Sequence, residues 1–251
     1  MNEVLFIGLA LGMRHAVDPD HLAAIDGLTW LRPRRMNGIY FVLGHSLVVI
    51  LLAVGIGHLV AERFAFLGPW TLIAIGAVNL WRLVHPSKIA PQSKPARPII
   101  GQPFLLGMLL AAGFETASQL SALIIAGQNN PWILGLAFSA GMVLVDGIDG
   151  SLAAGTQQLA ATGQTNALKA SKLLGVIIVI FSFGLGGAEL IGVELDAFIF
   201  PLGLILFAAV VSIRIWARSN VSANRAPNLP PESQTGEDTN DKGVRNVAQV
   251  F

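Results

Sequence analysis

The sequence contains little of what a soluble, redox-active or nucleotide-hydrolysing protein needs. Its 251 residues include no cysteine, which excludes disulfides, thiolate metal ligands and thiol redox chemistry. Only 12% of the residues are Asp, Glu, Lys or Arg, against roughly 25% in a typical soluble domain. No Gly-x-x-x-x-Gly-Lys-Ser/Thr loop is present, so the chain itself is not expected to hydrolyse ATP. The first residues, MNEVLF, lack the basic start of a signal peptide.

Long apolar segments occupy most of the chain, and 53% of its residues are hydrophobic. Several of these segments approach or exceed the roughly 20 residues that a helix needs to cross a bilayer. The sequence therefore predicts an all-α, multi-pass integral membrane protein with about seven transmembrane helices. The predicted helices cover about 4–30, 36–60, 66–84, 102–126, 132–159, 167–191 and 197–216.

Basic residues gather in every second connection between these helices, and the alternate connections contain only Arg63. Cytoplasmic loops carry the excess of Lys and Arg, so the N-terminus is expected outside and the C-terminus in the cytoplasm. We expect a transmembrane domain at 1–218 in the cell (plasma or inner) membrane and a disordered cytoplasmic tail at 219–251, whose composition cannot bury a core. The clustered basic residues are Arg32, Arg34, Arg35, Arg82, Lys88, Lys94, Arg97, Lys169, Lys172, Arg214 and Arg218.

Few ionisable residues remain within the predicted helices. Such groups cost several kcal/mol in hydrocarbon, so they usually face a cavity and mark a pathway. At about 1.5 Å per helical residue, His15, His45, Glu115 and Asp146 all fall near the middle of the bilayer. The ionisable residues are Arg14, His15, Asp18, Asp20, His21 and Asp26 in the first helix, His45 in the second, Glu115 in the fourth, and Asp146 and Asp149 in the fifth.

Histidines and carboxylates together are typical metal ligands, since imidazole suits transition metals and carboxylates add negative charge. His15 and Asp18 share a helix face, whereas a straight helix would turn His21 away from His15 by about 120°. Pro19 cannot donate a hydrogen bond to the carbonyl of His15 and disfavours a continuous helix. A break at 18–20 would aim both histidines at one point, as the discontinuous helices of secondary transporters do.

Several of these residues also have ordinary structural explanations. A single buried histidine such as His45 is most often a hydrogen-bonded core residue. Asp26 lies near the inner boundary, where it can pair with Arg32 or Arg34, and Arg14 can neutralise a carboxylate of the motif. Glycines such as those at 113, 141 and 150 are typical of close helix packing. These explanations account poorly for the segment HAVDPDH taken as a whole.

With those residues assembled, the chain resembles the nickel/cobalt transporter family of the NicO superfamily. RHAVDPDH at 14–21 is similar to the family signature, His, four residues, Asp, His. LGHSLVV at 43–49 is similar to its second motif, GFETASQ at 113–119 to its third, and GMVLVDGIDG at 141–150 to its fourth. All four motifs stand in the family's order, and together they are far more specific than any one of them.

The resemblance implies a transporter rather than an enzyme, with Ni²⁺ or Co²⁺ as cargo. It implies no tightly bound cofactor, no nucleic acid, and the lipid bilayer and the metal ion as partners. Within this reading, His15, Asp20, His21 and His45 select the metal. The expected metal ligands are His15, Asp18, Asp20, His21, His45 and Asp146, and the residues expected along the pathway or around the ligands are Arg14, Ser46, Glu115, Thr116, Gln119 and Asp149.

The chain departs from the family pattern at three motif positions. Glu115 stands where the third motif has aspartate, Gln119 where it has glutamate, and Gly147 where the fourth motif has threonine. The site is therefore less acidic at Gln119, which bears on the preferred metal. Larger members carry an extra helix before the signature, so this chain is similar to the short form of the family.

A weak internal similarity suggests two related halves. LALGMRHAVD near the start is similar to LLAAGFETAS, and LGHSLVV is similar to AGMVLVD, both at an offset of about a hundred residues. Units of three helices invert between copies, so the fold is expected to be a 3+3 inverted repeat plus one helix. The expected mechanism is exchange of the ion's water for His and Asp ligands, followed by rocking of the two units.

Uptake is the expected direction, and efflux through the same site is the alternative. A histidine-rich cytoplasmic loop would favour efflux, but the segment HPSKIAPQSKPARP has a single histidine. Two enzyme classes also compete with the transporter. His15 and Asp20 match the His-x-x-x-x-Asp pattern of acyltransferases, in which histidine is a general base. The same residues could instead hold zinc with an open water position in a membrane hydrolase.

Overall fold

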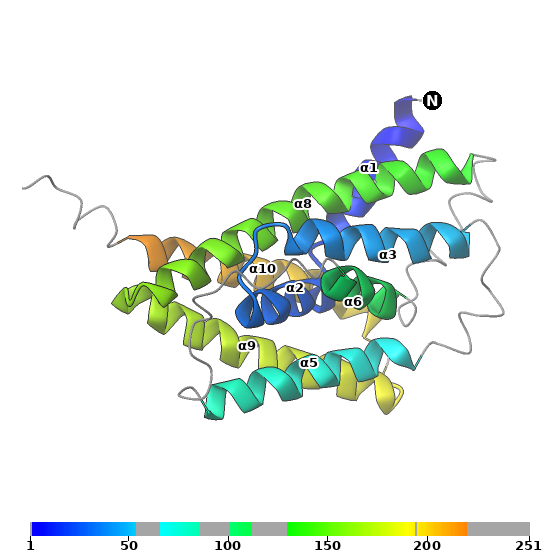
Figure 1. The fold of residues 1–251 in the computed structure, drawn as a ribbon. Helices are drawn as coiled ribbons and strands as arrows, with labels where there is room; N and C mark the ends of the chain where they lie inside the picture. Colours follow the sequence, from blue (N-terminus) through cyan, green and yellow to red (C-terminus); the bar gives the residue numbers. More distant parts are fainter. Residues whose placement is uncertain (1, 54–65, 86–100, 112–129, 194, 220–251) are drawn as a thin grey trace, which may run out of the picture.

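The computed structural model describes residues 2–53, 66–85, 101–111, 130–193 and 195–219. Every regular element in these ranges is a helix (Figure 1). The helices are α1 (Asn2–His15), α2 (Pro19–Leu31), α3 (Asn37–Ala53), α5 (Leu67–Val84), α6 (Gly101–Ala111), α8 (Pro131–Ala161), α9 (Thr165–Leu190) and α10 (Asp196–Arg218).

Four of the described helices are long and apolar enough to cross a membrane: Leu67–Val84, Pro131–Ala161, Thr165–Leu190 and Ala197–Arg218. Shorter apolar helices cover Leu5–His15, Asn37–Leu51 and Gln102–Ala111. Large apolar side chains such as Ile180 and Ile205 are exposed on the outer surface of the bundle, as a lipid-facing surface requires. The fold is that of an all-helical membrane protein, and the count of seven spans and the orientation stay predictions.

The predicted helix at 4–30 is wrong as a single element, because the structure divides it into α1 and α2. Asp18 has extended backbone angles, φ −61° and ψ 144°, and Pro19 is the first residue of α2. A residue before proline is disfavoured in the helical region, and proline is favoured at the first position of a helix. The break lies at 16–18, slightly before the expected 18–20.

The other described helices begin and end within a few residues of the predicted ones where the structure describes their ends. Three predicted segments lie partly outside the described residues. They are the helix at 102–126, described to 111, the helix at 36–60, described to 53, and the tail at 219–251, of which only Ser219 is described.

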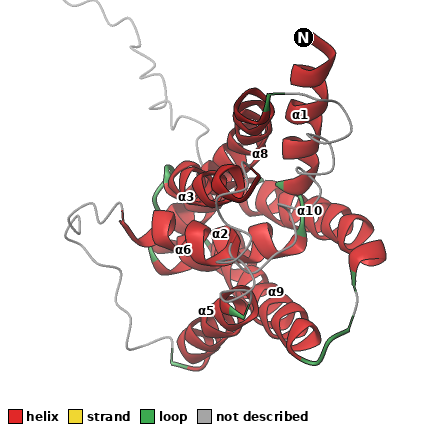
Figure 2. Ribbon diagram, turned by 90° about the vertical axis from the view of Figure 1, so that its right-hand side faces the viewer, coloured by secondary structure: helices red, strands yellow, loops and turns green. Residues whose placement is uncertain are grey.

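Helix α2 lies at the centre of the bundle and is surrounded by the other helices (Figure 2). All of its residues except Leu28 and Leu31 are buried. A helix that is apolar around its whole circumference is expected in a core position, and α2 also carries two carboxylates and a histidine there. The residues of α2 are therefore held from several sides, by α5, α8, α9 and α10.

Two close helix crossings depend on glycine. At the first, between α1 and α8, a Cβ on Gly12 would lie 1.9 Å from the Phe138 carbonyl oxygen, and one on Gly141 would lie 2.1 Å from that of Leu9. At the second, between α3 and α6, a Cβ on Gly44 would lie 1.9 Å from the carbonyl oxygen of Phe104. Small residues let helix backbones approach this closely in membranes.

These two crossings have the same form. In the expected repeat, α1 and α6 are the first helices of the two units, and α3 and α8 are the second helices. Each first helix crosses the second helix of the other unit, and α3 and α8 pack against each other between the two crossings. This arrangement agrees with an inverted repeat, which stays a prediction.

We predict that Gly141→Ala destabilises the protein, because its Cβ would overlap the Leu9 carbonyl oxygen. The expected loss in the free energy of unfolding is about 1–3 kcal/mol, as for other overpacked sites. The matched control is Gly184→Ala in α9, whose Cβ would meet no atom within 4 Å. Denaturant unfolding in detergent measures both variants, and equal stabilities would contradict the role of the crossing.

Candidate metal site

Three histidines from three helices converge at the break between α1 and α2. His15 is the last residue of α1, His21 lies in the first turn of α2, and His45 lies in the middle of α3. One ring nitrogen from each lies within 4.8 Å of the others. The Nε2 atoms of His15 and His45 are 3.3 Å apart. Because the helix is interrupted, His15 and His21 reach one point that they could not share on a continuous helix.

Two of these histidine rings have a carboxylate oxygen beside Nδ1. Asp18 Oδ2 lies 2.7 Å from Nδ1 of His15, and Asp146 Oδ2 lies 2.9 Å from Nδ1 of His21. A neutral ring that donates from Nδ1 carries its lone pair on Nε2. Carboxylates commonly fix the tautomer and orientation of metal-binding histidines in this way. Asp18 and Asp146, expected as metal ligands, therefore each have one oxygen engaged with a histidine.

The cluster concentrates buried polar atoms that have no hydrogen-bond partner among the described residues. His21 and His45 are 0% exposed, yet Nε2 of His21 and Nδ1 of His45 have no such partner. The same holds for Asp20 Oδ2 and for the hydroxyl of the buried Ser46. Each unpaired buried group costs about 1–3 kcal/mol. Imidazole nitrogens with nearby carboxylate oxygens form a donor set that suits a divalent transition-metal ion.

The remaining predicted site residues differ in their placement. Arg14 places its guanidinium over the Phe200 ring, 4.9 Å from the ring centroid, and the described residues show no ion pair between it and a motif carboxylate. Glu115, Thr116 and Gln119 lie outside the described residues.

A second buried polar layer involves a residue that sequence reasoning missed. Arg214 of α10 pairs with Asp26 of α2 and Asp149 of α8. The sequence predicts that Arg214 is one of the basic residues flanking a helix, and that Asp26 pairs with Arg32 or Arg34. The structure corrects both interpretations. One feature of the sequence could have indicated a buried role for Arg214. It lies one helical turn before Arg218, which already ends the apolar segment.

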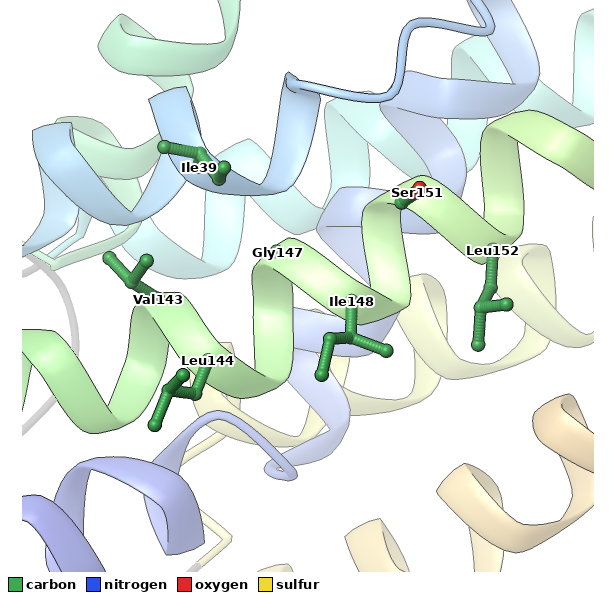
Figure 3. Close-up of a pocket in the computed structure, with 7 residues that line it drawn as sticks. All are labelled: Ile39, Val143, Leu144, Gly147, Ile148, Ser151 and Leu152. Carbon is green, nitrogen blue, oxygen red and sulfur yellow. The ribbon is translucent and has the colours of Figure 1, made fainter.

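An apolar groove of about 350 Å³ lies between α3 and α8 (Figure 3). Ile148 at its edge is 62% exposed, so the groove opens to the outer surface of the bundle. Gly147, which replaces the family's threonine, lines this groove rather than the histidine cluster. The groove residues are Ile39, Val143, Leu144, Gly147, Ile148, Ser151 and Leu152.

We predict that Asp146→Asn weakens metal binding by about 10- to 100-fold, the usual cost of losing a partner that orients a ligand. The amide removes the charge behind the His21 ring while keeping the side-chain size. Ser151→Ala, on the same helix but facing the outer groove, is the matched control. Calorimetric titration of the purified chain with Ni²⁺ measures both variants, and an unchanged affinity for Asp146→Asn would contradict the orienting role.

The sequence is similar to a family of known proteins and to several of its members. A family model described as NicO, high-affinity nickel-transport protein, matches residues 4–64, which include all three histidines. The chain is 30% identical to the hydrogenase nickel incorporation protein HupN of Bradyrhizobium diazoefficiens over 243 residues, covering 74% of this chain and 64% of HupN. It therefore spans slightly less than two thirds of HupN.

Two further relatives extend the comparison. The chain is 30% identical to the high-affinity nickel transport protein of Cupriavidus necator over 247 residues, covering 76% of this chain and 70% of that protein. A stretch of 52 residues is 50% identical to the cobalt transport protein NhlF of Rhodococcus rhodochrous, covering 19% of this chain and 15% of NhlF. No solved structure matches the chain significantly. These relatives are named as transport or nickel-incorporation proteins, not as acyltransferases or hydrolases, and the chain belongs to the NicO family of high-affinity nickel-transport proteins.

Proposed function

We propose that this chain carries divalent transition-metal ions, Ni²⁺ or Co²⁺, across the cell membrane through the histidine cluster. The observation that carries the proposal is the convergence of His15, His21 and His45 within 4.8 Å at a helix break, in the buried centre of an apolar bundle. An isolated core histidine needs only a hydrogen-bond partner, whereas here three rings also bring one nitrogen each within 4.8 Å of the others. The names of the relatives, which specify nickel or cobalt, support the same metals.

The donor set suggests how the ion crosses. A hydrated ion would exchange water for imidazole nitrogens, and oxygens of Asp20, Asp18 or Asp146 would add negative charge. The half of the predicted repeat that contains α1, α2 and α3 would then rock against the half that contains α8, changing the side to which the cluster is open.

Uptake is the direction that we propose. A membrane potential, negative inside, favours entry of a cation by about 2.3 kcal/mol per charge for each 100 mV. A divalent ion would gain twice that amount, so entry needs no other energy source under a normal potential. The predicted orientation, with the N-terminus outside, places the start of α1 towards the source of the ion. Efflux by the same site is the competing direction.

The test is flux of radioactive nickel into proteoliposomes that contain the purified chain, under an inside-negative or inside-positive potential. We expect saturable flux that is faster with the inside negative, because the cation then moves down the field. His21→Ala should reduce it at least 100-fold, since it removes one of three ligands. His85→Ala, at the end of α5 and outside the cluster, is the matched control and should transport normally.

Competition by Co²⁺, Zn²⁺ and Mn²⁺ in the same assay ranks the metals. Absence of flux in a folded protein under either potential, or normal flux in His21→Ala, would contradict the proposed function. Export from loaded vesicles without import would assign the efflux direction instead.

A further inference from the structure

The arginine of α10 is buried inside the helix bundle and contacts two carboxylates at once. Arg214 is 1% exposed, and Asp26 and Asp149 are also buried. One terminal nitrogen, Nη2, donates to Asp26 Oδ1 at 2.5 Å and reaches Asp149 Oδ2 at 3.4 Å. The other, Nη1, donates to Asp149 Oδ1 and, at 3.3 Å, to the Asp149 backbone carbonyl. One cation therefore ties α10 to both α2 and α8.

The ionic group formed by Arg214, Asp26 and Asp149 lies next to the histidine cluster along α2 and α8. On α8, Asp146 contacts His21 and Asp149 contacts Arg214, and the two carboxylates are three residues, or about 4.5 Å, apart along the helix. On α2, His21 and Asp26 are five residues, or about 7.5 Å, apart. The ionic group thus follows the histidine cluster directly towards the C-terminal ends of α2 and α10, where the basic connections are predicted.

Helix α10 lies alongside α1 and α2, from the histidine cluster to Arg214. Phe200 lies against Arg14 at the end of α1. Gly203 lies so close to the break that a Cβ there would be 2.3 Å from the Val17 carbonyl oxygen. Arg214 then reaches Asp26 near the end of α2. In the predicted 3+3+1 arrangement, α10 is the helix outside the repeat, and the ion site gives it no role.

We propose that Arg214 is the gate on this side of the metal site, a conclusion that rests on the proposed function. Its guanidinium is a fixed cation beside a site for a divalent cation, so it repels an ion that moves towards it. It also occupies the two carboxylates that could draw that ion onward. The ion passes only when α10 withdraws the guanidinium from Asp26 and Asp149.

The test variant must remove the gate without leaving unpaired charge. Substituting Arg214 alone would strand two buried carboxylates, which is strongly destabilising, whereas replacing a whole buried ionic set is often tolerated. The variant is therefore Asp26→Asn, Asp149→Asn and Arg214→Gln together, which keeps the size of the two carboxylate side chains and places a shorter, uncharged side chain at 214. Arg214→Lys retains the cation, and Arg218→Gln, one turn further along α10 and exposed, is the matched control.

The measurement is exchange of bound radioactive nickel against unlabelled nickel in full-length protein held in nanodiscs. The neutral triple variant should exchange at least tenfold faster than wild type while its equilibrium Kd changes less than threefold, because a gate alters entry and exit rates together. Arg214→Lys and Arg218→Gln should stay within threefold of the wild-type rate. A folded triple variant with the wild-type exchange rate, or one whose faster release is matched by weaker binding, would overturn the gate.

A second experiment uses the absence of native cysteine. Ala160 of α8 and Ala217 of α10 belong to one buried cluster beyond Arg214, so Ala160→Cys with Ala217→Cys allows a short, reducible cross-link. Cross-linking should slow exchange at least tenfold, and reduction should restore it. Unchanged exchange in fully cross-linked protein would also overturn the gate. Wild-type nickel binding that survives His21→Ala would instead refute the proposed function, independently of Arg214.

Discussion

The cost of burying polar and charged groups in an apolar bundle is the constraint on which this structure depends. Four of the buried carboxylates each have a specific partner. Asp18 and Asp146 bond to histidine rings, while Asp26 and Asp149 share one arginine. Most of the buried polar atoms that have no partner among the described residues belong to the histidine cluster, its carboxylates and Ser46. A ligand that accepts nitrogen and oxygen donors would relieve that cost at one point, and the helix break and the glycine crossings bring the donors there.

Local chemistry made a large part of the fold predictable. Apolar length gave the helices, and the missing N–H of Pro19 predicted a break within the first of them. Drawing 4–30 as one continuous helix was wrong, because the structure divides it at that break. The extended backbone of Asp18 and the new helix beginning at Pro19 are both consequences of the proline ring, and both could be anticipated to within about two residues.

Pairing between distant residues could not be read from the sequence in the same way. Both a metal and a histidine can engage Asp146, and only the packing of α8 against α2 places its Oδ2 on the ring of His21. Likewise, Arg214 resembles a residue at a membrane boundary until α10 is seen beside α2. Tertiary contacts separated by 125 and 188 residues decide these partners, and spacing along one helix carries no information about them.

The central claim is that neutral imidazoles from α1, α2 and α3 form the inner coordination shell of the ion. X-ray absorption spectroscopy at the nickel edge of the loaded, full-length protein tests it most directly, because scattering from an imidazole ring differs from that of a carboxylate or water. The account predicts three imidazoles, completed by oxygen, and two imidazoles in His45→Ala. A shell of oxygen alone, or one that His45→Ala leaves unchanged, would contradict it.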